Sequence, residues 1–203
     1  MFLELDDVLV HTFICDENTG YIAKPTFKDP EHEFMLAEPR LPILLYERDN
    51  AREFMKYLVD TKSEIETVVF TRAEKIYVDE ILRYLDPERK VFDHVLTQNA
   101  CYRLFKEDDD VDHYLKDISR FKNRRLERSV LADPDSLNFA MTPENGMPII
   151  PYKGENFLDS EEKDGYLLTV IDEIEELRQM DDVRPYLDQT YGHRQLLKNA
   201  KLI

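Results

Sequence analysis

The sequence predicts an α/β fold with a central parallel sheet that is covered on both faces. Short apolar runs alternate along the chain with segments whose apolar residues recur at helical spacing, a pattern typical of parallel sheets. Charged or hydroxyl side chains directly follow several of these runs, and reactive groups collect at the carboxyl ends of parallel strands. A length of 203 residues with 42% hydrophobic composition suits one compact domain over 1–203.

The first predicted strand, Phe2–Val10, is interrupted by acidic residues. It leads into the polar, proline-punctuated stretch 16–40, which we interpret as a surface insertion. The apolar run Leu41–Tyr46 follows, and Asp49 or Asn50 can cap the helix predicted after it.

The next predicted strand, Glu66–Phe70, is centred on a pair of β-branched valines that suits a buried position. A helix with an apolar stripe follows, and Asp86-Pro87 ends it. Ser129–Ala132 and Met147–Ile150 are two further short apolar runs, which we assign to the same sheet.

The C-terminal part, 160–203, is predicted to be helical. Glu161–Met180 is amphipathic. A last helical segment, Val183–Leu202, begins at Arg184-Pro185, where proline suits the first turn.

Net charge limits the partners of this chain. A formal charge of −16 opposes binding to nucleic acid, so we expect protein partners and no nucleic-acid partner. An acidic run, Glu107–Asp110, is predicted to be a solvated loop or a docking surface for a basic partner. A short basic cluster is predicted to be solvated or to pair with the chain's own acids; it consists of Lys122, Arg124, Arg125 and Arg128.

Cysteine and histidine spacing indicates neither a disulfide framework nor a zinc site. Cys15 and Cys101 are far apart, which favours a reducing compartment, and the five histidines are scattered. No stretch approaches the ~20 apolar residues of a membrane-spanning helix. Because a core strand begins directly after Met1, we expect a leader, tether or membrane anchor upstream in the full protein.

Five side chains at predicted strand ends point to phosphoryl transfer. Glu4 and Asp6 are among the acids that interrupt the first strand, Thr71 directly follows the second and Asp133 a later one, while Lys116 precedes that later strand. Covalent phosphoryl transfer needs a carboxylate nucleophile, a second acid, and cations or hydroxyls around the phosphoryl oxygens, usually with a metal ion. Their order and spacing, more than any single residue, carry this interpretation.

These motifs resemble the RNA polymerase C-terminal-domain phosphatases, a family that also includes Dullard and the presequence receptor of the mitochondrial inner-membrane translocase. Glu4 to His11 stands where the family has D-L-D-E-T-L-V-H, and Val69 to Arg72 stands where it has L-F-T-A. Leu115 to Ser119 is similar to V-K-D-L-S, and Asp182 to Leu187 is similar to a D-V-R-x-x-L tail. The resemblance implies a three-layer haloacid-dehalogenase (Rossmann-like) fold with a small insertion after the first strand.

The resemblance also implies a role for each site residue. Glu4 takes the nucleophile's place and Asp6 the acid/base position. Thr71 and Lys116 take the phosphate-holding positions, and Asp133 belongs to the fourth motif. Glu4, Asp6 and Asp133 would be the ancestral magnesium site.

Two departures from the family pattern predict that the site is inactive. The nucleophile position carries glutamate, whose extra methylene misplaces the carboxylate, and Pro134 stands where the family has a magnesium-binding asparagine. We therefore expect no bound cofactor or metal, and we expect Lys116 to pair with the acids of the former pocket.

Two functions follow from this pattern. The first is a degenerate phosphatase-fold subunit of a mitochondrial inner-membrane assembly. Its host could be a protein-import translocase, where it would resemble the receptor, or a respiratory or ATP synthase complex, with membrane association through partners or an upstream segment. The alternative is an active magnesium-dependent phosphoserine/phosphothreonine phosphatase of the cytoplasm or nucleus.

Overall fold

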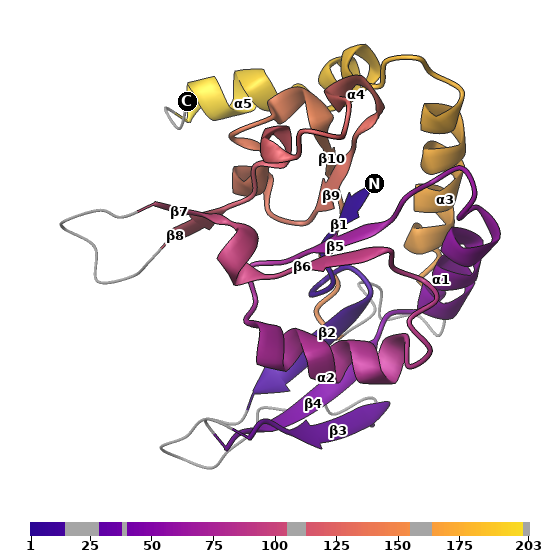
Figure 1. Ribbon diagram of the computed structural model, residues 1–203, viewed down its shortest axis with the longest axis vertical. Helices are drawn as coiled ribbons and strands as arrows, with labels where there is room; N and C mark the ends of the chain where they lie inside the picture. Colours follow the sequence, from indigo (N-terminus) through magenta and orange to yellow (C-terminus); the bar gives the residue numbers. More distant parts are fainter. Residues whose placement is uncertain (15–28, 38–39, 105–112, 155–163, 201–203) are drawn as a thin grey trace.

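The computed structural model describes residues 1–14, 29–37, 40–104, 113–154 and 164–200. Its centre is a five-stranded sheet with the order β10-β9-β1-β5-β6, in which every strand pair is parallel (Figure 1). This confirms the predicted α/β fold. The strands are β1 (Phe2–Leu3), β5 (Val68–Phe70), β6 (His94–Leu96), β9 (Leu131–Asp133) and β10 (Gly146–Pro148).

The two faces of this sheet bury different clusters of apolar side chains. Because side chains alternate along a strand, Leu3 and Val69 enter one cluster while Phe2 and Phe70 enter the other. The first cluster also receives side chains of the helices, and α1 packs beside α3. The helices are α1 (Ala51–Asp60), α2 (Lys75–Leu85), α3 (Tyr166–Arg178), α4 (Arg184–Tyr191) and α5 (His193–Asn199).

Short 3₁₀ turns and loops cover the second face. Phe139 and Ile118 lie in two of these turns and pack against Phe2 and Phe70. A separate hairpin, β7 (Tyr102–Leu104) with β8 (His113–Leu115), projects from this side of the molecule. Within the described ranges, no helix combines the length and hydropathy needed to cross a bilayer.

The predicted single strand Phe2–Val10 is wrong, because the chain turns at Asp7. Asp7 has a φ of 62°, and its amide donates to the carbonyl of Val10 over 2.7 Å. The turn directs the chain out of the central sheet into an antiparallel one. Its order is β2-β4-β3, from β2 (Val10–Ile14), β4 (Pro42–Glu47) and β3 (His32–Met35).

Other boundaries also differ from the sequence-based expectations. The predicted insertion 16–40 contains strand β3, and its residues 16–28 and 38–39 lie outside the described residues. The last helical segment is divided into α4 and α5 at Gly192, whose φ of 59° ends the first helix. Strand β6 was not predicted. The acidic run Glu107–Asp110 and Cys15 lie outside the described residues.

Candidate functional site

The strand ends bring the predicted site residues to one edge of the central sheet. In register, Leu3 lies opposite both Val69 and Ala132, because β1 is flanked by β5 and β9. The residues that follow these positions therefore share the carboxyl edge. Four of the predicted residues are buried there; their exposed fractions are 6% for Glu4, 1% for Thr71, 0% for Lys116 and 1% for Asp133.

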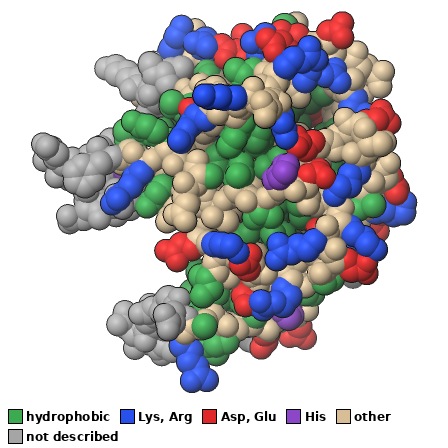
Figure 2. Space-filling view, viewed as in Figure 1, with side chains coloured by type: hydrophobic (Ala, Val, Ile, Leu, Met, Phe, Trp, Pro, Cys, Tyr) green, Lys and Arg blue, Asp and Glu red, His purple; other side chains and the backbone are tan. Residues whose placement is uncertain are grey.

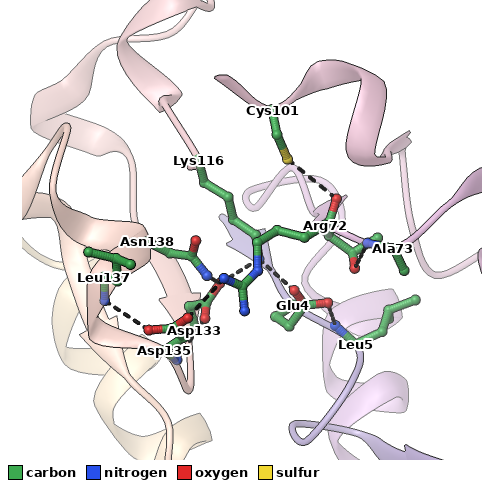
Figure 3. A network of polar contacts seen from close by, with 11 residues as sticks. Glu4, Leu5, Arg72, Ala73, Cys101, Lys116, Asp133, Asp135, Leu137 and Asn138 are labelled. Carbon is green, nitrogen blue, oxygen red and sulfur yellow. Dashed lines mark hydrogen bonds and ion pairs between the residues drawn. The ribbon is translucent and has the colours of Figure 1, made fainter. Parts of the chain in front are cut away.

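Lys116 joins two of the carboxylates. Its ammonium nitrogen lies 2.7 Å from Oε2 of Glu4 and also donates to Oδ2 of Asp133 (Figure 3). Burial favours the neutral form of the lysine, but the two carboxylates outweigh it and raise the pKa of Lys116. The face of the Phe70 ring, 5.7 Å from the nitrogen, adds a cation–π contact. The expected pairing of Lys116 with the acids of this pocket is confirmed.

The other carboxylate oxygens of this network also accept hydrogen bonds from the chain itself. Oε1 of Glu4 accepts from the amide of Leu5 over 2.8 Å. Oδ1 of Asp133 accepts from the amide of Asp135 over 2.8 Å, and Oδ2 accepts from Nδ2 of Asn138 over 3.0 Å. All four oxygens of Glu4 and Asp133 thus have internal donors.

Asn138 is a site residue that the sequence analysis missed. It is fully buried, and its side-chain oxygen has no partner among the described residues. It stands five residues after Asp133, in a 3₁₀ turn, η4 (Ser136–Phe139). Only its polar type in an otherwise apolar segment could have indicated this position.

Asp6 lies apart from this ion-paired network. Oδ1 of Asp6 accepts from the hydroxyl of Tyr77 over 2.5 Å, and that hydroxyl lies 2.6 Å from Oγ1 of Thr12. Burial, together with the charge of Glu4, raises the pKa of Asp6 to about 7, although the Tyr77 hydrogen bond opposes the rise. A carboxyl group with this pKa can hold or release a proton near neutral pH.

Thr71 also has its own partner. Its hydroxyl oxygen accepts from the amide of Ala73 over 3.0 Å, and its carbonyl accepts from Sγ of Cys101 over 3.6 Å. Burial raises the pKa of the Cys101 thiol. Three of the five predicted residues therefore form one contact network, and Asp6 and Thr71 adjoin it.

An open cavity of about 500 Å³ is lined in part by Glu4, Asp6 and Asp133. Its lining has five carboxylates and two cations, and each cation is paired with an acid: Arg72 with Asp135 at 3.0 Å, and Lys153 with Asp7. The cavity thus carries an excess of negative charge. Its lining consists of Glu4, Asp6, Asp7, Arg72, Asp133, Pro134, Asp135, Ser136, Pro151 and Lys153.

The donor set of this cavity fits Mg²⁺ poorly. Magnesium prefers near-octahedral oxygen ligation. Here Pro134 contributes no side-chain oxygen, and Lys116 engages both Glu4 and Asp133. In the part of the chain that the structure describes, no group of three or more histidine, cysteine or acidic side chains is arranged to hold a metal ion.

The remaining polar predictions concern residues outside this network. Nδ1 of His11 lies 2.6 Å from a carboxylate oxygen of Asp7, an ordinary hydrogen-bonding role. In the basic cluster, Arg124 forms a two-point ion pair with Glu66. Part of that cluster therefore pairs with the chain's own acids, as expected.

Comparison with known proteins confirms the family resemblance. The family model described as NLI interacting factor-like phosphatase matches residues 1–184. Among curated relatives, CTD small phosphatase-like protein 2 of Dictyostelium discoideum is 26% identical over 201 residues, covering 98% of this chain and 31% of the relative. The mitochondrial import inner membrane translocase subunit TIM50 of Candida glabrata is 29% identical over 151 residues, covering 73% of this chain and 28% of the relative.

Solved structures show the same fold. The structure of Fcp1, described as an essential RNA polymerase II CTD phosphatase, superposes with a TM-score of 0.54 at 17% identity. The superposition covers 94% of this chain and 52% of that one. The chain spans about a third of the length of the curated relatives described above.

Proposed function

This chain belongs to the NLI interacting factor-like phosphatase family, and from that premise we propose that it is a catalytically inactive member that binds other proteins. One observation carries the proposal: both oxygens of Glu4, at the nucleophile's position, have donors inside the protein. Each oxygen can accept a further bond, but these two donors fix the orientation of the Glu4 carboxylate.

Geometry supports this reading of Glu4. An attacking carboxylate must lie in line with phosphorus at about 3 Å, and displacement by an ångström can cost on the order of a hundredfold in rate. The extra methylene of Glu4 lengthens the side chain, and its oxygens are fixed by the Leu5 amide and by Lys116. Loss of the metal ligand at Pro134 weakens the same step, because magnesium normally neutralises charge on the transferring group.

The proposed role is that of a subunit of a larger assembly at the mitochondrial inner membrane. Support comes from relatives that are subunits of the mitochondrial import inner membrane translocase, including those of Candida glabrata and Candida albicans, the latter 30% identical over 145 residues. A translocase subunit and an accessory subunit of a respiratory or ATP synthase complex are both compatible with a fold that serves for binding.

A second candidate is a magnesium-dependent phosphoserine/phosphothreonine phosphatase. The raised pKa of Asp6, about 7, favours it, because a general acid works best with a pKa near the working pH. Asp6 also lines the open cavity, where a leaving group could reach it. The relatives named CTD small phosphatase-like proteins agree with this alternative.

Hydrolysis of an aryl phosphate by the purified domain, with and without magnesium, separates the two. We expect no turnover above the buffer rate. A Glu4→Asp/Pro134→Asn double variant, which restores the family pattern, is expected to gain magnesium-dependent activity. A Glu66→Asp/Pro87→Asn variant is the matched control, since neither residue lines the cavity. Magnesium-dependent turnover that Glu4→Ala abolishes would reject the inactive assignment.

Binding is tested separately by the size of the native complex. We expect the protein to migrate with a large membrane complex after gentle detergent extraction of mitochondria. Migration as a solitary monomer, or recovery from the cytosol only, would contradict the proposed role.

A further inference from the structure

An apolar groove lies on the second face of the central sheet, between strands β1, β5 and β6 and residues 121–124. Its floor contains Phe2 and Val68, its far wall Leu96, and its outer wall Phe121, whose ring stacks on Phe2 at 5.4 Å between centroids. The hollow measures about 230 Å³ and adjoins a second one of similar size, which shares Phe2, Val68 and Arg124. Figure 2 shows hydrophobic side chains gathered in the middle of this face, with basic and acidic side chains around them.

The segment that forms the groove's outer wall is basic. Residues 120–128 contain five cations and one acid, in a chain whose net charge is −16. Arg124 is neutralised by Glu66, and the guanidinium of Arg128 donates to the backbone carbonyls of Arg178 and Met180. Among the described residues, Lys122, which lines the groove, is exposed and has no carboxylate partner. Arg125 is also exposed but lines neither hollow. This leaves positive charge uncompensated beside apolar surface.

We infer that this groove docks an acidic segment of a partner protein, with an apolar side chain of that segment seated between Phe121 and Leu96. A hollow of about 230 Å³ is smaller than the ~300–1,000 Å³ of typical small-molecule sites, so it suits one or two side chains of a peptide. Buried apolar anchors with charged residues at the rim are the usual construction of a protein-binding site. The cations at the rim favour a partner segment with negative charge.

Other polyanions fit the groove less well. Nucleic acid or an anionic membrane would meet the field of the whole chain, which is strongly negative, and would gain little from a narrow apolar hollow. A short acidic peptide presents its charge only to the local basic rim.

The inference rests on the proposed function only in taking the partner to be a protein. The test is fluorescence anisotropy with a labelled peptide of alternating Glu and Asp around a central Phe-Leu pair. We expect binding that weakens with salt, and a loss of about tenfold or more in affinity for Lys122→Glu. Lys198→Glu, which reverses an exposed cation on α5, is the matched control and should bind normally. Phe121→Ser, with its melting temperature checked, should weaken binding at any salt concentration.

Failure of this inference is distinct from failure of the proposed function. Glu4→Ala should bind the peptide as the wild type does, whether or not the wild type hydrolyses phosphate. Absence of peptide binding up to ~1 mM, equal binding of the charge-reversed variant, or tighter binding to single-stranded DNA or to phosphatidylserine vesicles would each overturn the inference.

Discussion

The ammonium group of Lys116 lies 2.7 Å from Oε2 of Glu4, and both side chains are buried. This pair stands at the centre of the sheet edge, where the family's chemistry is expected. Burying a charge is costly unless a partner compensates it, so each of these residues depends on the other.

We predict that Lys116→Met destabilises the protein strongly, because it leaves the charges of Glu4 and Asp133 without a buried counter-ion. The expected loss is about 3–5 kcal/mol in the free energy of unfolding, measured by urea denaturation. Lys122→Met, at an exposed site, is the control and should change stability by less than ~0.5 kcal/mol. Adding Glu4→Gln and Asp133→Asn to Lys116→Met should recover part of the loss. If Lys116→Met has the same free energy of unfolding as the control, the ion pair does not contribute to stability.

Asp6 gives the protein a pH dependence near neutrality. Its pKa of about 7 in the folded state exceeds the 3.8 of a free side chain, so between these values the folded protein holds a proton that the unfolded chain has lost. This contribution to stability falls as the pH rises from about 4 through 7. Asp6→Asn should therefore be more stable than the wild type at pH 8, by up to roughly 4 kcal/mol, and nearly equal at pH 4. If the difference in the free energy of unfolding between the two proteins does not change with pH across this range, the prediction is wrong.

His193 should give the stability of the protein the opposite pH dependence. It is 3% exposed, neither ring nitrogen has a partner among the described residues, and it packs on Phe139 at 4.5 Å between centroids. Burial lowers its pKa, and Asp188 opposes this only in part. The unfolded chain therefore takes up a proton first, and stability falls as the pH drops below about 6.5. His193→Phe should flatten the fall in melting temperature between pH 7 and 5, and an unchanged slope would rule His193 out as its source.

Gly146 is predicted to tolerate no side chain. A Cβ atom there would lie 2.5 Å from Cγ of the Phe139 ring, which is fully buried. Gly146→Ala should cost about 1–3 kcal/mol by forcing the ring to shift, measured by thermal and urea denaturation. Gly165→Ala is the matched control, because among the described residues no atom beyond its chain neighbours lies within 4 Å of its Cβ position. Equal stabilities of the two variants would show that the ring moves without cost.

The sequence predicted the site better than it predicted the element boundaries. Glu4 and Asp133 come together because they stand at the carboxyl ends of neighbouring parallel strands, whose order follows from alternating elements. Lys116 follows β8 of the separate antiparallel hairpin and reaches both carboxylates from there. Their mutual ion pairs followed from the cost of burying charge. Asn138 was missed, because a side chain that reaches back five residues from a 3₁₀ turn leaves no periodic signal.

The boundaries failed where one residue changes the chain's direction. Asp7, with its left-handed backbone, divides the run Phe2–Val10 between two sheets; the acidic residues in that run mark an interruption but do not indicate a change of direction. Strand β6 was missed because it has only two apolar residues, which follow the exposed His94 and are too few to stand out. Such elements are set by pairing with a neighbour, here β5, more than by their own composition.

The order of strands in the sheet also bears on how the chain assembles during synthesis. Strand β1 is made before both of its neighbours, β5 and β9, and the second of these begins at residue 131. The apolar residues of β1 therefore lack a complete set of neighbouring strands until most of the domain has left the ribosome. Contacts so distant in sequence make folding slow and leave the nascent chain open to aggregation, which gives chaperones a defined interval in which to hold it.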